Sequence, residues 1–314
     1  MMDSIDMNQL LLWFAGFGAA VLLSPLLGGI INKVKAFFAG RKGPRVLQLY
    51  YDIAKLLKKG SIRSTTSAGL VGVFPLLNVT ALLTAALLLP FSFAVSPFSF
   101  EGDLLLFLYL LGFGRVITTL GALDTGSSFE GMGASRELQF SVLAELAFLG
   151  IAAFLVIETK EYALSAMLTG THAGLHILAG ICAAFALFIV LLVESCRVPF
   201  DDPETHLELT MIHEAMVLDN GGPGLAFIHY GAYLKLWMLS IFLVSMLLPG
   251  CSFYASPWLG LILQIGAIFC VAVLIGILES TTARYRFLKV PQMLLAAFAF
   301  SAIALLLLIF QGVK

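Results

Sequence analysis

Carboxylates gather in residues 193–220, which read VESCRVPFDDPETHLELTMIHEAMVLDN and hold seven acids against one base, Arg197. The acids are Glu194, Asp201, Asp202, Glu204, Glu208, Glu214 and Asp219. Like charges held close together repel and raise one another's pKa values, and such carboxyl groups can exchange protons near neutral pH. The stretch therefore fits either the mouth of a proton or ion path, or a solvated acidic loop.

The local pattern predicts a helix inside this stretch. Pro203 suits the first helical position, Asp201 or Asp202 can cap the helix, and Asp201 with Glu204 has capping-box spacing. On such a helix Asp201, Glu204 and Glu208 lie at i, i+3 and i+7. Three carboxylates are therefore expected to project from one face.

Four ionisable residues lie inside or at the end of long apolar runs: Arg115, Glu145, Glu194 and Lys235. An unpaired charge at that depth of a membrane costs ~2.5–3.5 kcal/mol or more, so such residues face a bundle interior or a wet cavity. They are functional candidates for that reason. The structural alternative is a static Arg115–Glu145 or Lys235–Glu194 ion pair.

Cysteine and histidine spacing does not indicate a metal site. The chain has four cysteines and five histidines. They are Cys182, Cys196, Cys251, Cys270, His172, His176, His206, His213 and His229. These residues lack the paired spacing of a zinc site or an iron–sulfur cluster. We expect this chain to bind no metal and no cofactor.

The elements that must position these residues are membrane helices. Hydrophobic residues make up 60% of the chain and charged residues 12%, with a mean hydropathy of +0.99, whereas soluble domains carry about 25% charged residues. Runs of about 20 apolar residues, enough to cross the bilayer, lie near 9–31, 69–90, 103–123, 138–157, 173–194, 226–248, 257–279 and 291–311. We expect an all-α integral membrane protein with about eight transmembrane helices in one domain, residues 1–314.

Charge asymmetry predicts the orientation. Loop 32–68 holds nine basic residues, and alternate loops add Arg136, Arg197, Arg284, Arg286 and Lys289, which places 14 of the 18 on one side. That side is expected to be cytoplasmic. Both termini should then lie on the non-cytoplasmic side.

The first apolar run is as long as a full span and has no basic region before it, so it does not resemble a signal peptide. The net charge of −1 gives no support for nucleic-acid binding.

Two cytoplasmic segments have recognisable local patterns. Apolar residues recur at three- and four-residue spacing over 46–57, which predicts a short amphipathic helix. This helix would either lie on lipid headgroups or form a lid or docking surface. Residues 123–137, LDTGSSFEGMGASRE, contain three glycines and predict a turn-rich connector whose charges, Glu137 among them, are solvated.

Two longer motifs resemble a known family. RKGPRVLQLYYDIAKLLKK (41–59) and ESCRVPFDDPETHLEL (194–209) resemble the first loop and the acidic loop of the eight-helix membrane subunit of respiratory NADH dehydrogenase and energy-converting hydrogenases. Residues 123–137 and LESTTARYR (278–286) are similar to the hydrogenase-type branch, that of formate hydrogenlyase subunit 4 and hydrogenase-4 component C. Ala232-Tyr233, and His206 between Glu204 and Glu208, depart from the NADH dehydrogenase pattern.

The resemblance implies a membrane anchor and coupling subunit in the cell membrane. Its partners would be hydrogenase large and small subunits, an iron–sulfur subunit and antiporter-like membrane subunits, and the nickel–iron centre and iron–sulfur clusters would lie in those partners. The implied acidic ion path is Glu145, Glu194, Asp201, Glu204 and Glu208. The implied charge partners are Arg115, Arg136, Arg197, Lys235 and Glu279. The implied docking surface for the peripheral arm includes Arg41, Arg45, Asp52 and Lys55.

Two alternatives remain open. One is the quinone-site membrane subunit of an NADH dehydrogenase-like complex. The other is a stand-alone secondary ion transporter, which would be expected to show two related halves with broken helices at matching positions.

Overall fold

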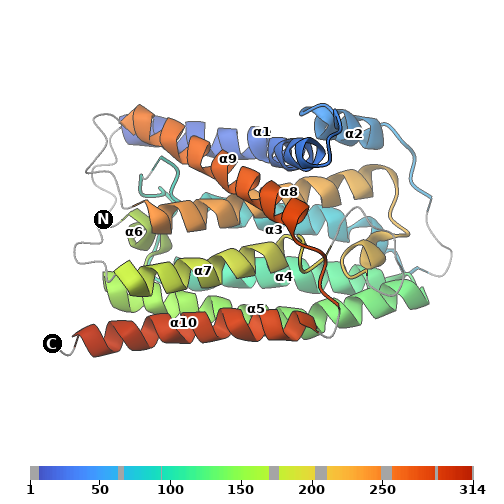
Figure 1. Ribbon diagram of the computed structural model, residues 1–314. Helices are drawn as coiled ribbons and strands as arrows, with labels where there is room; N and C mark the ends of the chain where they lie inside the picture. Colours follow the sequence, from blue (N-terminus) through green and yellow to red (C-terminus); the bar gives the residue numbers. More distant parts are fainter. Residues whose placement is uncertain are drawn as a thin grey trace.

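A computed structural model describes residues 7–62, 67–92, 94–169, 177–201, 211–248, 257–286 and 289–312. In these ranges the only regular elements are helices (Figure 1). Seven are long and apolar enough to cross a membrane: α1 (Met7–Phe38), α4 (Asp103–Asp124), α5 (Ser128–Thr159), α7 (Ile177–Glu194), α8 (Gly222–Leu247), α9 (Pro257–Thr281) and α10 (Val290–Gly312). With the shorter apolar helix α3 (Phe74–Leu87), they confirm the expected helical membrane protein of about eight helices.

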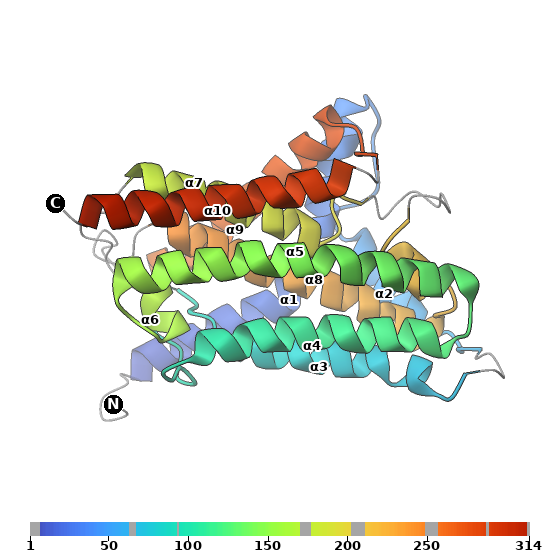
Figure 2. The same cartoon turned by 90° about the horizontal axis from the view of Figure 1, so that it is seen from below.

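The helices form one bundle with α8 near its centre. Among the spanning helices α8 has the largest buried share. Helix α3 packs against α4 and α8, α10 packs along α5 and α7, and α9 crosses α1 at an angle (Figures 1 and 2). The start of α1 and the end of α10 lie at one end of the bundle, opposite α2 and the α4–α5 connection.

Helix α3 is shorter than its predicted span. At about 1.5 Å per residue its 14 residues reach roughly 21 Å, less than the ~30 Å of bilayer hydrocarbon. A 3₁₀ turn, η1 (Leu70–Gly72), precedes it and Pro75 lies in its first turn. The predicted run over 69–90 is therefore a helix with a turn at each end.

The amphipathic helix of the first loop is present as α2 (Gln48–Leu57). It packs on α8 and α1, and no residue of α2 is fully buried. Close approach to α1 depends on Gly29, where a Cβ atom would lie 1.9 Å from the carbonyl oxygen of Val46. The helix therefore lies across one end of the bundle.

The predicted turn-rich connector over 123–137 is wrong. Helix α4 ends at Asp124 and α5 already begins at Ser128. Glycine disfavours a helix only by about 1 kcal/mol per residue, and packing against the segment that contains η2 (Glu214–Val217) overrides it. Gly133 permits that packing, because a Cβ atom there would meet Ala215 and the Ile212 carbonyl oxygen, both at 2.9 Å.

Gly133 and Gly131 make a matched pair for a test of this packing. We expect Gly133→Ala to lower stability by roughly 1–3 kcal/mol, because an added methyl group overpacks the contact. A Cβ at Gly131 would meet only Leu123, at 4.0 Å, so Gly131→Ala should be neutral or stabilising through helix propensity. Thermal unfolding of the solubilised protein measures both, and equal effects would contradict the packing.

Candidate ion path in the membrane interior

Four charged side chains from four helices form one cluster inside the bundle. Arg115 of α4 donates through Nη1 to Oε1 of Glu194, at 2.6 Å, and through Nη2 to Glu145 of α5. Lys235 of α8 pairs with Oε2 of Glu194, at 2.7 Å. Both ion pairs that the sequence allowed are therefore present, and Arg115 and Glu194 join them.

The end of α7 explains why Glu194 needs two cations. Glu194 is the last residue of α7, where the partial negative charge of the helix end disfavours a carboxylate. The helix closes in the manner of a Schellman motif, with the Arg197 amide donating to the Leu192 carbonyl oxygen and Cys196 in the left-handed region at φ 52°. Arg115 and Lys235 offset the unfavourable position of Glu194.

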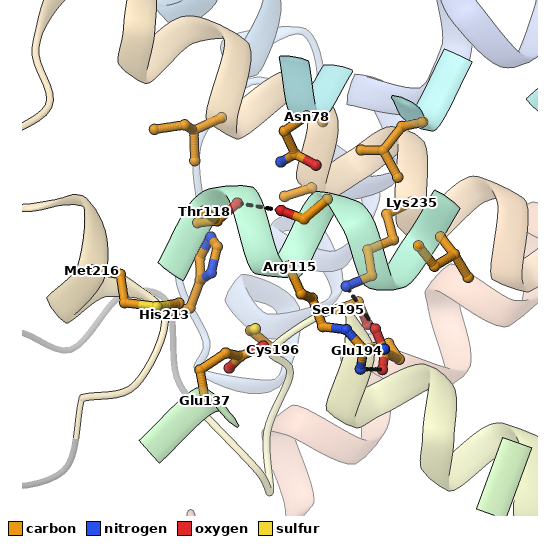
Figure 3. A pocket seen from close by; sticks show the side chains of 16 residues that line it. Asn78, Arg115, Thr118, Glu137, Glu194, Ser195, Cys196, His213, Met216 and Lys235 are labelled. Atoms are coloured by element: carbon orange, nitrogen blue, oxygen red, sulfur yellow. Dashed lines mark hydrogen bonds and ion pairs between the residues drawn. The ribbon is translucent and has the colours of Figure 1, made fainter. Parts of the chain in front are cut away.

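A polar cavity adjoins the cluster. Its volume is about 60 Å³, room for a few water molecules. Polar and ionisable side chains reach it from α3, α4, α5, α7, α8 and the segment before η2 (Figure 3). They are Asn78, Arg115, Thr118, Glu137, Glu194, Ser195, Cys196, His213 and Lys235. The cluster therefore borders a space where water can connect these groups.

Two cavity residues differ from what the sequence predicts. Asn78 of α3, which no motif singled out, approaches α4 at Gly114, where a Cβ atom would lie 2.5 Å from the Asn78 side-chain oxygen. A lone amide within the apolar run FPLLNVT was the available signal for it. Glu137, expected in a solvated loop, instead lines the cavity (Figure 3).

Glu145 lies at the opposite edge of the cluster. Its side chain is 51% exposed, against 10% for Arg115 and 8% for Glu194. It opens into a groove of about 840 Å³ that is lined mainly by apolar residues of α4 and α5. The charge cluster therefore separates a small polar cavity from a large apolar groove on the side of the bundle.

Asp201 anchors the segment that closes the cavity. Its carboxylate accepts hydrogen bonds from the amides of Ile212, at 3.3 Å, and His213, at 3.0 Å, and pairs with Arg284, at 2.5 Å. Arg136 of α5 donates to the Met211 carbonyl oxygen, at 2.8 Å. The predicted path residues Glu204 and Glu208, and the helix predicted to start at Pro203, lie outside the described residues.

Arg197 and Glu279 form a second charged group, which makes no ion pair with the first among the described contacts. Glu279 of α9 is fully buried and pairs with Lys35 of α1, at 3.2 Å, and with Arg197, at 3.6 Å. The Arg197 guanidinium lies 5.3 Å from the centre of the Tyr233 ring. This group holds α1, α9 and the end of α7 together.

The predicted docking residues divide into two sets. Arg41, Arg45 and Lys55 are exposed at the end of the bundle that carries α2. Asp52 is instead half-buried, accepts a hydrogen bond from Gln48 at 3.0 Å, and lines a cavity of about 320 Å³ beneath α2. Asp52 therefore faces the bundle rather than outward.

Among the described residues, no three His, Cys, Asp or Glu side chains are placed to hold a metal ion together. The side chains that meet in the cluster are carboxylates already paired with cations.

Comparison with known proteins places the chain among membrane subunits. The family model described as NADH dehydrogenase matches residues 11–310. Hydrogenase-4 component C of Escherichia coli (strain K12) is 32% identical over 90% of this chain and 91% of its own length. Formate hydrogenlyase subunit 4 of the same organism is 31% identical over 90% of this chain and 93% of its own length.

A solved structure has the same fold. A chain of the membrane-bound sulfane sulfur reductase, an archaeal respiratory membrane complex, superposes with a TM-score of 0.75 at 18% identity. The match covers 95% of this chain and all of that one.

Removing the shared carboxylate should cost stability. Glu194→Gln leaves Arg115 and Lys235 without their common anion, and loss of one partner of a buried pair costs on the order of 3–5 kcal/mol. Glu145→Gln is the matched control, with a smaller expected loss because Glu145 is half exposed and Arg115 keeps Glu194. Denaturant unfolding in detergent measures both, and equal losses would contradict the central role of Glu194.

Proposed function

The chain belongs to the NADH dehydrogenase subunit 1 family, and from that premise we propose that it is the membrane anchor and coupling subunit of a multisubunit hydrogenase complex. It links electron transfer in a peripheral arm to proton or sodium translocation. The observation that carries the proposal is the charge cluster of Arg115, Glu145, Glu194 and Lys235 in the middle of a multi-pass bundle.

The hydrogenase branch is favoured by the relatives. Both Escherichia coli proteins align over about nine tenths of each chain, so the similarity is not confined to one motif. One relative is named for hydrogenase-4 and the other for formate hydrogenlyase. The nickel–iron centre and the iron–sulfur clusters then belong to the hydrogenase large and small subunits and an iron–sulfur subunit.

The end of the bundle that carries α2 is the proposed cytoplasmic docking face, so that both termini lie outside. Arg41, Arg45 and Lys55 are exposed there, and a basic loop is expected on the cytoplasmic side. The peripheral arm docks on this face. Asp52 does not take part directly, because its carboxylate faces the cavity beneath α2.

The proposed ion path runs from this face into the bundle. It begins at Glu204 and Glu208, passes Asp201 and the polar cavity, and reaches the cluster at Glu194 and Glu145. Arg115 and Lys235 balance its carboxylates, while Arg136, Arg197 and Glu279 hold the surrounding helices. Waters in the cavity would carry protons between the side chains.

The path leaves the chain at Glu145. A half-exposed carboxylate in the middle of a membrane helix costs several kcal/mol against lipid. The α4–α5 groove therefore faces protein in the assembled complex. An antiporter-like membrane subunit is the proposed neighbour, and the ion would pass to it from Glu145.

A quinone-site subunit is the second candidate. The cavity beneath α2, about 320 Å³, is lined by Asp52, Arg197, His229 and Tyr233 together with apolar residues. Its size and its mixed polar and apolar lining are compatible with the ring of a quinone, whose carbonyl oxygens accept hydrogen bonds. The two candidates differ in whether electron flow through the complex depends on quinone.

Co-purification tests the assembly. The tagged chain, solubilised with its native partners, is expected to elute with a nickel-containing large subunit and to form or oxidise hydrogen without quinone. The measurements are nickel analysis of the eluted complex and its rate of hydrogen oxidation with an artificial electron acceptor. A stable isolated chain that moves ions by itself, or inhibition by a quinone-site ligand, would contradict the proposal.

The path has its own test. Glu145→Gln and Glu204→Gln should each lower ion translocation by about tenfold or more, since a positioned proton-transfer group contributes at least that much. Hydrogenase activity with an artificial acceptor should stay within about twofold, because electron transfer lies in the partners. Translocation is followed in inverted membrane vesicles by a pH-sensitive dye, with sodium flux in parallel, and full coupling in both variants would rule the path out.

A further inference from the structure

Glu137 is the unpaired carboxylate of the polar cavity. It lies on α5 eight residues before Glu145, about two helical turns along the same helix. Its side chain reaches the cavity beside Cys196 and His213 (Figure 3). Among the residues that the structure describes, none forms a hydrogen bond or ion pair with Glu137.

The other two carboxylates of this region are engaged by cations. Glu194 is held at both oxygens, by Arg115 at 2.6 Å and by Lys235 at 2.7 Å. Glu145 is held by the other nitrogen of Arg115. Protonation of either residue would break a charge-assisted hydrogen bond or ion pair.

A charge count singles out Glu137. With all groups ionised, Glu137, Glu145 and Glu194 carry three negative charges, and Arg115 and Lys235 supply two positive ones. Asp201 is balanced by Arg284, so one negative charge is left over in this group, and an uncompensated buried charge is costly. A single proton cancels it, and Glu137 can take that proton without breaking an ion pair.

The charges around Glu137 act in both directions. Burial disfavours its anionic form, Lys235 and Arg115 attract that form from α8 and α4, and Glu194 and Asp201 repel it from the end of α7 and the following turn. Each of the two forms of Glu137 therefore has surroundings in this cavity that stabilise it.

His213 can pass a proton to this site without becoming charged. It lies before η2, outside the membrane-spanning helices, and lines the same cavity. Burial and the positive charges of Lys235 and His229 lower the pKa of His213 from 6.5 to about 4. The imidazole is therefore neutral near pH 7, with one nitrogen that donates and one that accepts a hydrogen bond.

We propose that Glu137 binds the translocated proton inside the cavity, with His213 as a neutral relay and the Arg115–Glu194–Lys235 group as its fixed electrostatic surroundings. An N–H bond of His213 breaks as an O–H bond forms at a Glu137 carboxylate oxygen, while the other imidazole nitrogen takes a proton from a hydronium ion that enters the cavity. The O–H bond breaks when the proton passes to a cavity water on the way to Glu145. No electrons are transferred in either step, and the inference rests on the proposed function.

The first experiment uses the intact complex in inverted membrane vesicles. Glu137→Gln keeps the shape of the side chain but cannot carry the proton, so proton translocation should fall about 100-fold or to background. Hydrogenase activity with an artificial acceptor should stay near that of the wild type. Glu158→Gln is the control, since Glu158 lies near the other end of α5, outside the cavity, and it should translocate normally.

Chemical labelling of the wild-type complex gives a second measurement that needs no variant. Dicyclohexylcarbodiimide reacts with protonated carboxyl groups in apolar surroundings. We expect peptide mapping to place the label on Glu137, with translocation lost in proportion. A label on Glu145 or Glu194 with Glu137 unmodified would overturn the inference.

The outcomes separate the two proposals. Wild-type vesicles that form no ion gradient would overturn the proposed function, and this inference with it. A wild type that pumps, a Glu145→Gln variant that does not, and a Glu137→Gln variant that pumps at the wild-type rate would overturn only the role of Glu137.

Discussion

The middle of this bundle depends on the ion pairs of the Glu194 carboxylate. Arg115 lies 2.6 Å and Lys235 2.7 Å from its oxygens, at the end of a helix where a negative charge is otherwise disfavoured. Each charge would cost several kcal/mol alone in the membrane interior. Because Arg115 also holds Glu145, the relative positions of α4, α5, α7 and α8 are set by electrostatics as well as by apolar packing.

This constraint gives the bundle two different sides. On one side, helix ends and the segment anchored by Asp201 enclose a small polar cavity. On the other, α4 and α5 present a large apolar groove in which Glu145 is the exposed charge.

The second charged group gives mechanical support rather than a path. Glu279 is buried and pairs with Lys35 and Arg197, so α1 and α9 are tied to the turn that follows Glu194. These two ion pairs therefore join helices that are far apart in the sequence.

Local patterns in the sequence determined the membrane class, the eight apolar segments and the amphipathic helix predicted over 46–57, because hydropathy and periodicity are summed over neighbouring residues. The family was indicated by the resemblance of two contiguous motifs, 41–59 and 194–209. The sequence allowed the Arg115–Glu145 and Lys235–Glu194 pairs. Only the tertiary structure decided that Arg115 and Glu194, 79 residues apart, join them into one cluster. The tertiary structure also made the segment before Glu137 helical, because packing against 212–216 outweighs the cost of about 1 kcal/mol that each glycine adds to helix formation. The side chain of Glu137 consequently faces the cavity. The physical reason is the same in each case: a buried charge or a close helix contact is fixed by its partner, and the chain supplies that partner from a distant segment.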